Sequence, residues 1–320
     1  MLQQTQVKTV IPYWERWMRE LPTIQSLASA SAEKIHKLWE GLGYYTRVRN
    51  MQKAAQEIVA RHDGKFPRDF DDILALPGIG RYTAGAIASI AFNEPRPILD
   101  GNVIRVLTRV FGIEENPREK TANQKLWQLA EELVTTAARH ATRNTQQASH
   151  LNQSLMELGA LVCTPRQPAC LLCPVRSECV AYRTNRVERL PNLGPRAVAT
   201  SRRFVAFVVN HRGRFLVRQR PAGAVNAHLW EFPNIETSDD GAVLKRLAAR
   251  ELGLRITAVE KHCTVKHSIT RYRITLEAYE VRCAGVKASS AKVRWLTHKE
   301  LDALAFTSAH RKILTHLRGV

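Results

Sequence analysis

The stretch LPGIGRYTAG, residues 76–85, indicates the fold of the first half of the chain. Its two glycines permit a tight turn, and the run TAGAIASIA that begins inside it has the composition of a helix. Backbone amides at the start of such a helix can point at a phosphate. Gly78, Gly80 and Arg81 are therefore candidate contacts to a nucleic-acid backbone, and a plain turn between two helices is the alternative.

The charge of the chain supports a nucleic-acid partner. The 320 residues carry a net charge of +19, because 48 lysines and arginines outnumber 29 acidic residues. A polyanion is the expected partner, although a basic solubilising surface would give the same net charge. No apolar run approaches the roughly 20 residues of a membrane span, and MLQQTQVKTV lacks the features of a signal peptide, so we expect a cytoplasmic protein.

Three segments follow one another along the chain. Apolar residues recur at intervals of three and four from residue 3 to about residue 160, which predicts helices. The segment 181–201 has the arginines, prolines and glycine of a basic linker, and alternation with a period of two begins beyond it. We therefore predict a mainly α domain over residues 1–180, a linker over 181–201 and an α+β domain over 202–320.

Four cysteines lie near the C-terminal end of the predicted first domain. Cys163, Cys170, Cys173 and Cys179 have the spacing C-x6-C-x2-C-x5-C. Thiols crowded in this way in a reducing compartment indicate a metal centre rather than disulfides. Both zinc and a [4Fe-4S] cluster accept four thiolates. Structural zinc sites usually present two C-x2-C pairs and this array has one, so the spacing favours the cluster, with zinc and four unligated thiols as the alternatives.

The helical region, LPGIGRYTAGAI, then LDGNV and then the cysteine array occur in an order that resembles the helix-hairpin-helix DNA glycosylases with an iron–sulfur cluster. That family has an endonuclease III branch and an adenine-specific branch. The resemblance covers residues 1 to about 180. It implies a helix-hairpin-helix glycosylase fold, a [4Fe-4S] cofactor on the four cysteines and double-stranded DNA as the partner.

Asp100 matches the catalytic aspartate of this family. An aspartate before a glycine is by itself most often a turn former. The family's chemistry needs an anion beside the sugar, because cleavage of the N-glycosidic bond develops positive charge at C1′, and Asn102 could hold that carboxylate in register. Tyr82 stands where the endonuclease III branch has its lysine nucleophile. Since tyrosine cannot form a Schiff base, the resemblance implies base removal without efficient strand cleavage.

Removal of an adenine requires that the base be flipped out of the duplex. In the family, residues matching Gln4 and Tyr44 wedge into the DNA around the oxidised guanine, and Thr5 lies in the same stretch as Gln4. Gln153 matches a position that lines the adenine pocket. A packed loop aromatic is the alternative for Tyr44, and a helix-surface glutamine is the alternative for Gln153.

One residue of the family pattern falls outside the printed chain. The family places a glutamate, which protonates the departing adenine, two residues ahead of the methionine that matches Met1. We expect the chain that starts at Met1 to have little glycosylase activity, since general acid catalysis contributes a factor on the order of 10² to 10⁴. A truncated start and a natural variant that binds lesions without cutting them are the two explanations. The first is favoured because residues 2–10 continue family-like sequence.

The second domain, with LWEFPNIE and ARELGLRI, resembles the MutT-like (Nudix-fold) domain attached to adenine glycosylases. Only Arg250 and Glu251 match the acidic helix that binds magnesium in Nudix hydrolases, so recognition is expected rather than hydrolysis. The family probes the guanine lesion with a loop that reads Phe-Ser-His, and Ile269, Thr270 and Arg271 align there with all three residue types changed. Thr270 could donate to the oxidised base and Arg271 could hold a phosphate, and an ordinary loop is the alternative.

These features predict a monomeric, monofunctional glycosylase of base excision repair that acts on adenine mispaired with 8-oxoguanine or guanine. Asp100 would stabilise the cation, and residues 202–320 would check the opposite base. The alternatives are an endonuclease III-like glycosylase and lyase for oxidised pyrimidines, and a lesion-binding protein without catalysis.

Overall fold

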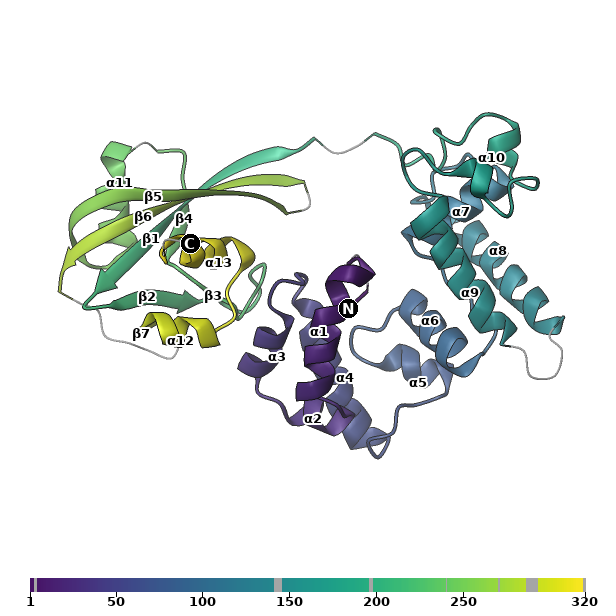
Figure 1. Ribbon diagram of the computed structural model, residues 1–320, viewed down its shortest axis with the longest axis horizontal. Coiled ribbons are helices and arrows are strands. Elements are labelled where there is room, and N and C mark those ends of the chain that lie inside the picture. The colour runs from purple at the N-terminus through teal and green to yellow at the C-terminus, as the bar shows by residue number, and fades with distance from the viewer. Residues whose placement is uncertain are drawn as a thin grey trace. The chain divides into compact units, whose positions relative to one another are not determined.

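The computed structural model describes residues 1–2, 5–140, 146–195, 198–239, 241–269, 271–285 and 293–318. It divides into two compact units: the first consists of Met1–Gly64 with Ala197–Val320, and the second of Lys65–Arg196. Figure 1 shows the strands confined to the C-terminal part of the chain, as the change in apolar periodicity predicts. None of the helices in these ranges is long and apolar enough to cross a membrane.

The second unit is helical. Its core is formed by apolar residues of α7, α8 and the chain before α7, among them Ile98, Val103, Leu107 and Leu126. The elements are α5 (Phe70–Ala75), α6 (Arg81–Phe92), α7 (Gly101–Phe111), α8 (Lys120–Arg139), α9 (Gln147–Glu157) and α10 (Val180–Arg183), with a short π-helix at Leu158–Val162 and a 3-10 helix at Cys170–Leu172. The helical prediction for this region is confirmed.

The turn between α5 and α6 is the predicted hairpin. Asp69 caps α5 by accepting hydrogen bonds from the amides of Asp71 (2.9 Å) and Asp72 (3.1 Å). Gly78 has a φ of +80°, a conformation that favours glycine. Gly85 lies against the carbonyl of Pro97, where a Cβ would come within 2.1 Å. A glycine is therefore needed for α6 to approach the chain before α7 this closely.

The first unit begins with four helices: α1 (Val7–Glu20), α2 (Ile24–Ser29), α3 (Ala32–Trp39) and α4 (Thr46–Arg61). Thr23 and Ser26 form a reciprocal capping box that starts α2, and Ser31 caps α3. Trp17 and Trp39 meet edge to face in the core, with ring centroids 5.8 Å apart. Leu229 and Ala305 from the C-terminal part complete this core. The helices therefore bury part of their apolar surface against residues that lie far away in sequence.

The rest of the first unit, residues 198–318, is called the strand domain below. Its sheet has the order β3-β2-β1-β6-β5, with β4 beside β1 and β7 beside β2, and β1 runs parallel to β6. The predicted hairpin around HRG is confirmed by the pairs Asn210↔Phe215 and His211↔Arg214. The elements are β1 (Thr200–His211), β2 (Arg214–Gln219), β3 (Trp230–Glu231), β4 (Asn234–Glu236), α11 (Gly241–Leu252), β5 (Arg255–Ile269), β6 (Tyr272–Ala284), β7 (Val293–Leu296), α12 (His298–Ala303) and α13 (Ser308–His316).

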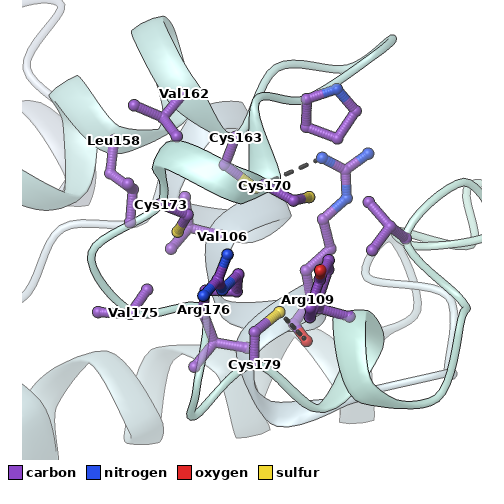
Figure 2. Close-up of a pocket in the computed structure, with 14 residues that line it drawn as sticks. Val106, Arg109, Leu158, Val162, Cys163, Cys170, Cys173, Val175, Arg176 and Cys179 are labelled. Carbon is purple, nitrogen blue, oxygen red and sulfur yellow. Dashed lines mark hydrogen bonds between the residues drawn. The ribbon is translucent and has the colours of Figure 1, made fainter.

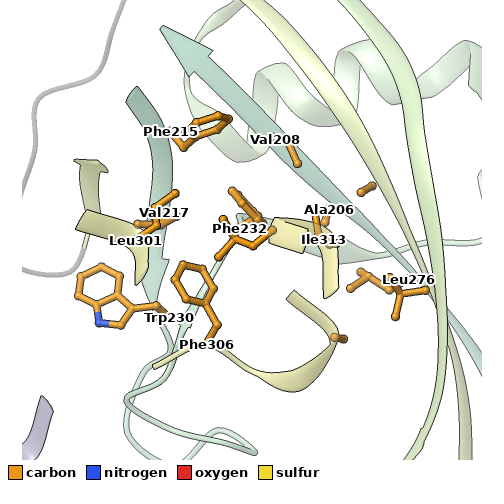
Figure 3. Packing of buried hydrophobic residues seen from close by; sticks show 14 of the residues in the cluster. Ala206, Val208, Phe215, Val217, Trp230, Phe232, Leu276, Leu301, Phe306 and Ile313 are labelled. Atoms are coloured by element: carbon orange, nitrogen blue, oxygen red, sulfur yellow. The ribbon is translucent and has the colours of Figure 1, made fainter. Parts of the chain in front are cut away.

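Strand β1 is buried on both faces of the sheet. Ala206 and Val208 pack into a cluster that includes Ile313 of α13 and is shown in Figure 3. Phe207 and Val209 point to the opposite face and pack with residues of α11. Helices thus cover both faces, and the predicted α+β architecture of this domain is confirmed.

Candidate functional site

The start of α6 combines a glycine N-cap with an exposed arginine. Its N-cap is Gly80, which offers no side chain to the first amides of the helix. Arg81 is exposed at the first helical position, with its guanidinium 4.0 Å from the centroid of the Trp127 ring. The positive end of the helix dipole and this guanidinium are the groups predicted to contact a phosphate.

Asp100 is held in place as the N-cap of α7. Its Oδ1 accepts hydrogen bonds from the amides of Asn102 (2.9 Å) and Val103 (2.8 Å), and the Asn102 side-chain amide donates to Oδ2 at 3.3 Å. Ile98 and Leu99 are buried directly before it and anchor the chain. The structure therefore brings Asp100 and Asn102 together as a fixed, partly exposed carboxylate, which can stabilise a developing cation.

Tyr82 lies in the first turn of α6 with its phenol half-buried. The hydroxyl donates a hydrogen bond to Met156 Sδ at 3.4 Å. Burial, together with the negative charge of Asp100, raises the pKa of Tyr82. A neutral phenol beside a carboxylate can position a sugar or water, but it cannot form an imine with C1′.

Gln153 of α9 is partly buried, and its Nε2 donates to Ser149 Oγ at 3.0 Å. The neighbouring Asn152 is 1% exposed and donates to Ser89 Oγ (2.8 Å) and to the Arg96 carbonyl (2.9 Å). These bonds tie α9 to α6 and to the chain before α7. Sequence reasoning did not find Asn152, although an amide between the apolar positions of a helix is a recognisable signal.

Two buried arginines of α7 join the Asp100 site to the cysteine loop, and sequence reasoning did not find them either. Arg105 donates to Asn102 Oδ1 (2.8 Å), to the Gly159 carbonyl (2.6 Å) and to the Cys163 carbonyl (2.7 Å). Arg109 donates to Cys163 Sγ at 3.4 Å. The two arginines are 8% and 2% exposed. The sequence does contain a signal for them, because the two arginines lie four residues apart on the apolar face of a helix. Charged residues are rarely buried without partners, so this pattern indicates a buried polar network.

All four predicted cysteine ligands line one small pocket of the second unit (Figure 2). They are free thiols, and the Cys179 thiol donates to the Arg109 carbonyl at 3.5 Å. Burial, followed by the charge of Cys163, raises the pKa of Cys170. The walls between the thiols include the apolar side chains of Val106, Leu158, Val162 and Val175.

The arrangement of the thiols bears on which group they can hold. Over the described ranges, no three His, Cys, Asp or Glu side chains form a group that could hold a metal ion. A zinc ion needs all its thiolates around one atom, whereas each thiolate of a [4Fe-4S] cluster binds a different iron. The four thiols around one pocket are the donor set that a [4Fe-4S] cluster requires.

The predicted wedge residues lie in the first unit. Tyr44 is 59% exposed and has a φ of +48°. The guanidinium of Arg47 lies 5.2 Å from the centroid of the Tyr44 ring, and Arg47 also donates to the Leu42 carbonyl at 3.3 Å. Thr5 is half-exposed just before α1. Gln4 falls outside the described residues.

The predicted lesion-reading loop connects β5 to β6. Ile269 pairs with Tyr272 across the hairpin, and Thr270 falls outside the described residues. Arg271 is exposed, its Nη2 donates to the Tyr272 hydroxyl at 3.2 Å, and its guanidinium lies 5.3 Å from that ring centroid. Arg271 thus carries a charge at the tip of the hairpin that can meet an anion.

Glutamates of the strand domain are paired with arginines. Glu251 forms an ion pair with Arg218, which also bonds the buried Glu231 at 2.9 Å, and Glu231 pairs in addition with Arg220. Burial lowers the pKa of the adjacent His310 to about 4. Because these carboxylates already have cationic partners, the geometry favours a stable scaffold over a magnesium site.

Comparison with known proteins finds a matching family for each half of the chain. Residues 1–132 match the HhH-GPD superfamily of base excision DNA repair proteins, and residues 204–316 match the NUDIX domain. The adenine DNA glycosylase of Rattus norvegicus is 37% identical over 377 residues, covering 100% of this chain and 71% of the relative. That of Buchnera aphidicola from Acyrthosiphon pisum is 30% identical over 322 residues, covering 99% and 88%. A solved thermostable thymine-DNA glycosylase has 26% identity and a TM-score of 0.49, covering 57% of this chain and 80% of that one.

Proposed function

Because the chain belongs to the adenine DNA glycosylases, which are base excision repair enzymes that hydrolyse N-glycosyl bonds, we propose that it releases adenine mispaired with 8-oxoguanine or guanine. The observation that carries the proposal is the Asp100 carboxylate, fixed by two backbone amides beside the neutral phenol of Tyr82. A fixed anion next to a group that cannot form an imine suits hydrolysis of a base–sugar bond.

The proposed chemistry follows from these two side chains. As the bond from C1′ to the adenine nitrogen breaks, its electron pair leaves with the base, which takes up a proton from water, and C1′ becomes cationic. The Asp100 carboxylate stabilises this cation, and Asn102 keeps the carboxylate oriented. Water then adds to C1′ and loses a proton, which leaves an abasic site in an intact strand.

Tyr82 separates this reaction from that of a glycosylase and lyase. Strand cleavage requires an amine that attacks C1′ and forms a Schiff base. Tyr82 instead donates a hydrogen bond from its hydroxyl to Met156 Sδ and has a raised pKa, because burial and Asp100 disfavour its phenolate. We therefore assign Tyr82 to positioning, and the lyase alternative is not favoured.

Cys163, Cys170, Cys173 and Cys179 would hold the [4Fe-4S] cluster in their shared pocket. With four protein ligands, the cluster would act as a structural centre that fixes the loop between α9 and α10. Arg109 would place a positive charge next to one thiolate through its bond to Cys163 Sγ. The same loop carries basic residues that can face a DNA backbone.

Recognition of the DNA would be shared among several contacts. The turn at Gly78 and Gly80, with Arg81, would grip a phosphate, while Gln153 would line the pocket of the flipped adenine. Tyr44, with Gln4 and Thr5, would fill the gap beside the opposite base. Thr270 and Arg271 would check that base from the strand domain. We propose that the protein does this as a monomer on cytoplasmic DNA.

The test compares duplexes that differ in one base pair. Adenine release is measured under single-turnover conditions, with the affinity of each duplex determined in parallel at several salt concentrations. We expect binding and release to be strongest for adenine opposite 8-oxoguanine, weaker opposite guanine and weakest opposite thymine, with affinity falling steeply as salt rises. Preference for an oxidised pyrimidine would contradict the proposal.

A further inference from the structure

Glu40 connects the strand domain to the end of helix α3. Its Oε1 accepts hydrogen bonds from the amide of Phe306 and from Arg311 Nε, both at 2.8 Å. Its Oε2 accepts a bond of 2.7 Å from Lys37 Nζ. Lys37 and Arg311 also both donate to the Leu304 carbonyl, at 3.1 Å and 2.6 Å. The Glu40 side chain is only 15% exposed, so these charge-assisted bonds form with little water around them.

Glu40 directly precedes the loop that carries Tyr44, residues 41–45, which we call the wedge loop. Gly41, Gly43 and Tyr44 have φ values of +104°, +68° and +48°. A left-handed conformation is unfavourable for tyrosine and persists where the surroundings fix it. Trp39 Nε1 donates to the Gly43 carbonyl at 3.0 Å, which fixes part of the loop from α3.

The other end of the wedge loop is fixed by a buried tyrosine. Tyr45 is 2% exposed, and its hydroxyl accepts a hydrogen bond of 3.2 Å from the Gly41 amide. Burial raises the pKa of Tyr45 to about 12. The loop therefore closes on itself around a neutral phenol, and the large side chain that it leaves exposed is that of Tyr44.

A second contact reaches the strand domain from beyond the loop. Arg49 of α4 donates through Nη1 to the Ala227 carbonyl at 3.1 Å. Leu229, which is fully buried, packs in the same core as Leu42 of the loop. The strand domain thus holds the chain on both sides of the wedge loop, through Glu40 before it and Arg49 after it.

We propose that Glu40 is a positioning residue that links docking of the strand domain to the conformation of the wedge loop. This inference rests on the proposed function, in which Tyr44 enters the DNA. With Glu40 bonded to Phe306 and Arg311, the end of α3 is fixed and Tyr44 is held ready for insertion. Without that carboxylate, the Phe306 amide and the Arg311 guanidinium lose their shared acceptor, and the loop is no longer tied to the domain that checks the opposite base.

The test is a double-mutant cycle on selectivity. Glu40→Gln, Glu40→Ala, Tyr44→Ala and the double variant Glu40→Ala/Tyr44→Ala are compared for affinity towards an adenine:8-oxoguanine duplex and the matched undamaged duplex. Glu33→Gln is the matched control, because Glu33 lies on α3, the helix that Glu40 ends, and reaches the same domain through a longer, exposed contact of 3.7 Å to Arg294. Fluorescence of 2-aminopurine beside the mispair reports insertion of the wedge.

We expect Glu40→Ala and Tyr44→Ala each to lower the ratio of the two affinities by about tenfold, with Glu40→Gln intermediate and Glu33→Gln unchanged. The double variant should be no worse than Tyr44→Ala, since Glu40 acts through Tyr44. If Tyr44→Ala lowers the ratio and both Glu40 variants do not, the inference fails and the proposed function stands.

Two further outcomes would overturn the inference. Equal losses for both duplexes in the Glu40 variants would show a general effect on charge or folding instead of positioning. An unchanged ratio in Tyr44→Ala would remove the wedge from the proposed function, and the inference with it. Glu40→Gln keeps the size and polarity of the side chain, so it serves the test if Glu40→Ala does not fold.

Discussion

The two units of the molecule differ in how their important contacts are spaced along the chain. In the second unit, Asp100 bonds the amides of residues two and three positions later, and the four cysteines share one pocket within a short segment. In the first unit, Glu40 bonds Phe306 and Arg311, which are 266 and 271 residues away. The Asp100 cap and the cysteine cluster of the second unit therefore depend on short-range spacing, whereas the Glu40 contacts of the first unit join segments that meet only after folding.

The largest expected effect concerns catalysis in the second unit. Asp100→Asn keeps the capping bonds to the start of α7 but removes the negative charge beside C1′, so adenine release should fall by a factor on the order of 10² to 10⁴. Single-turnover release, relative to the parent chain, measures the loss, and duplex affinity should stay within about twofold.

Asp69→Asn is the matched control, because Asp69 caps α5 in the same way and has no assigned chemistry. A similar fall in that variant would mean that the effect of Asp100 comes from helix capping. The negative charge of Asp100 would then have no role in adenine release.

The next effect concerns the joint core of the first unit. Leu229 is fully buried among residues of α1–α4, so Leu229→Ala should lower the free energy of unfolding by about 2–5 kcal/mol. Hydrogen exchange should rise in α3 and α4 as well as in the strand domain. Leu244→Ala removes one buried side chain of α11. It should raise hydrogen exchange in the strand domain without the same effect on α3. Unchanged exchange of α3 and α4 in Leu229→Ala would show that the helices do not depend on the strand domain.

A smaller effect is expected from loss of one cysteine. Cys173→Ser should remove the visible absorption of the cluster, raise hydrogen exchange between α9 and α10, and weaken duplex binding roughly tenfold as basic residues of the loop lose their places. Cys263→Ser in the strand domain should change none of these. Full duplex affinity in a Cys173→Ser protein without visible absorption would remove the loop from the DNA contacts.

The smallest expected effect is a pH dependence of the stability of the first unit. Burial lowers the pKa of His36 and of His310 to about 4, and both lie in the first unit. Because the unfolded chain takes up a proton near the ordinary pKa of about 6.5 and the folded chain does not, stability is full above that pH and falls as the pH drops towards 4. Tryptophan fluorescence and exchange in α3 and β3 should show this loss, and His310→Gln should reduce it. A pH-independent first unit would contradict the burial of these rings.

Local signals in the sequence were enough for the fold class and for several features of the site. The Gly78 turn and the β-hairpin at His211 follow from residue type and short spacing, and the structure confirms both of them. The family and the glycosylase activity are likewise confirmed by the comparisons. The catalytic, DNA-binding and ligand roles of the individual residues stay predictions, as do the domain boundaries at 180 and 202.

Contacts between distant segments could not be read from the sequence. Nothing in the pattern around Glu40 pairs it with Arg311, and the apolar period of α7 hides Arg105 until its acceptors at Gly159 and Cys163 are known. Glu251 matches a hydrolase motif by sequence, yet its ion pair with Arg218 depends on β2 and α11 lying together. Such pairs depend on sheet and helix packing, which short-range spacing does not specify.

The central claim is that this chain releases adenine by hydrolysis, with Tyr82 unable to form a covalent adduct. The most direct measurement incubates excess protein with an adenine:8-oxoguanine duplex, with and without borohydride, and analyses the free base, the strand and the protein–DNA adduct. The account predicts slow release of free adenine by this chain, a strand that breaks only after alkali, no trapped adduct for the parent chain, and an adduct for Tyr82→Lys. A borohydride-trapped adduct of the parent, or a strand cut without alkali, would contradict it.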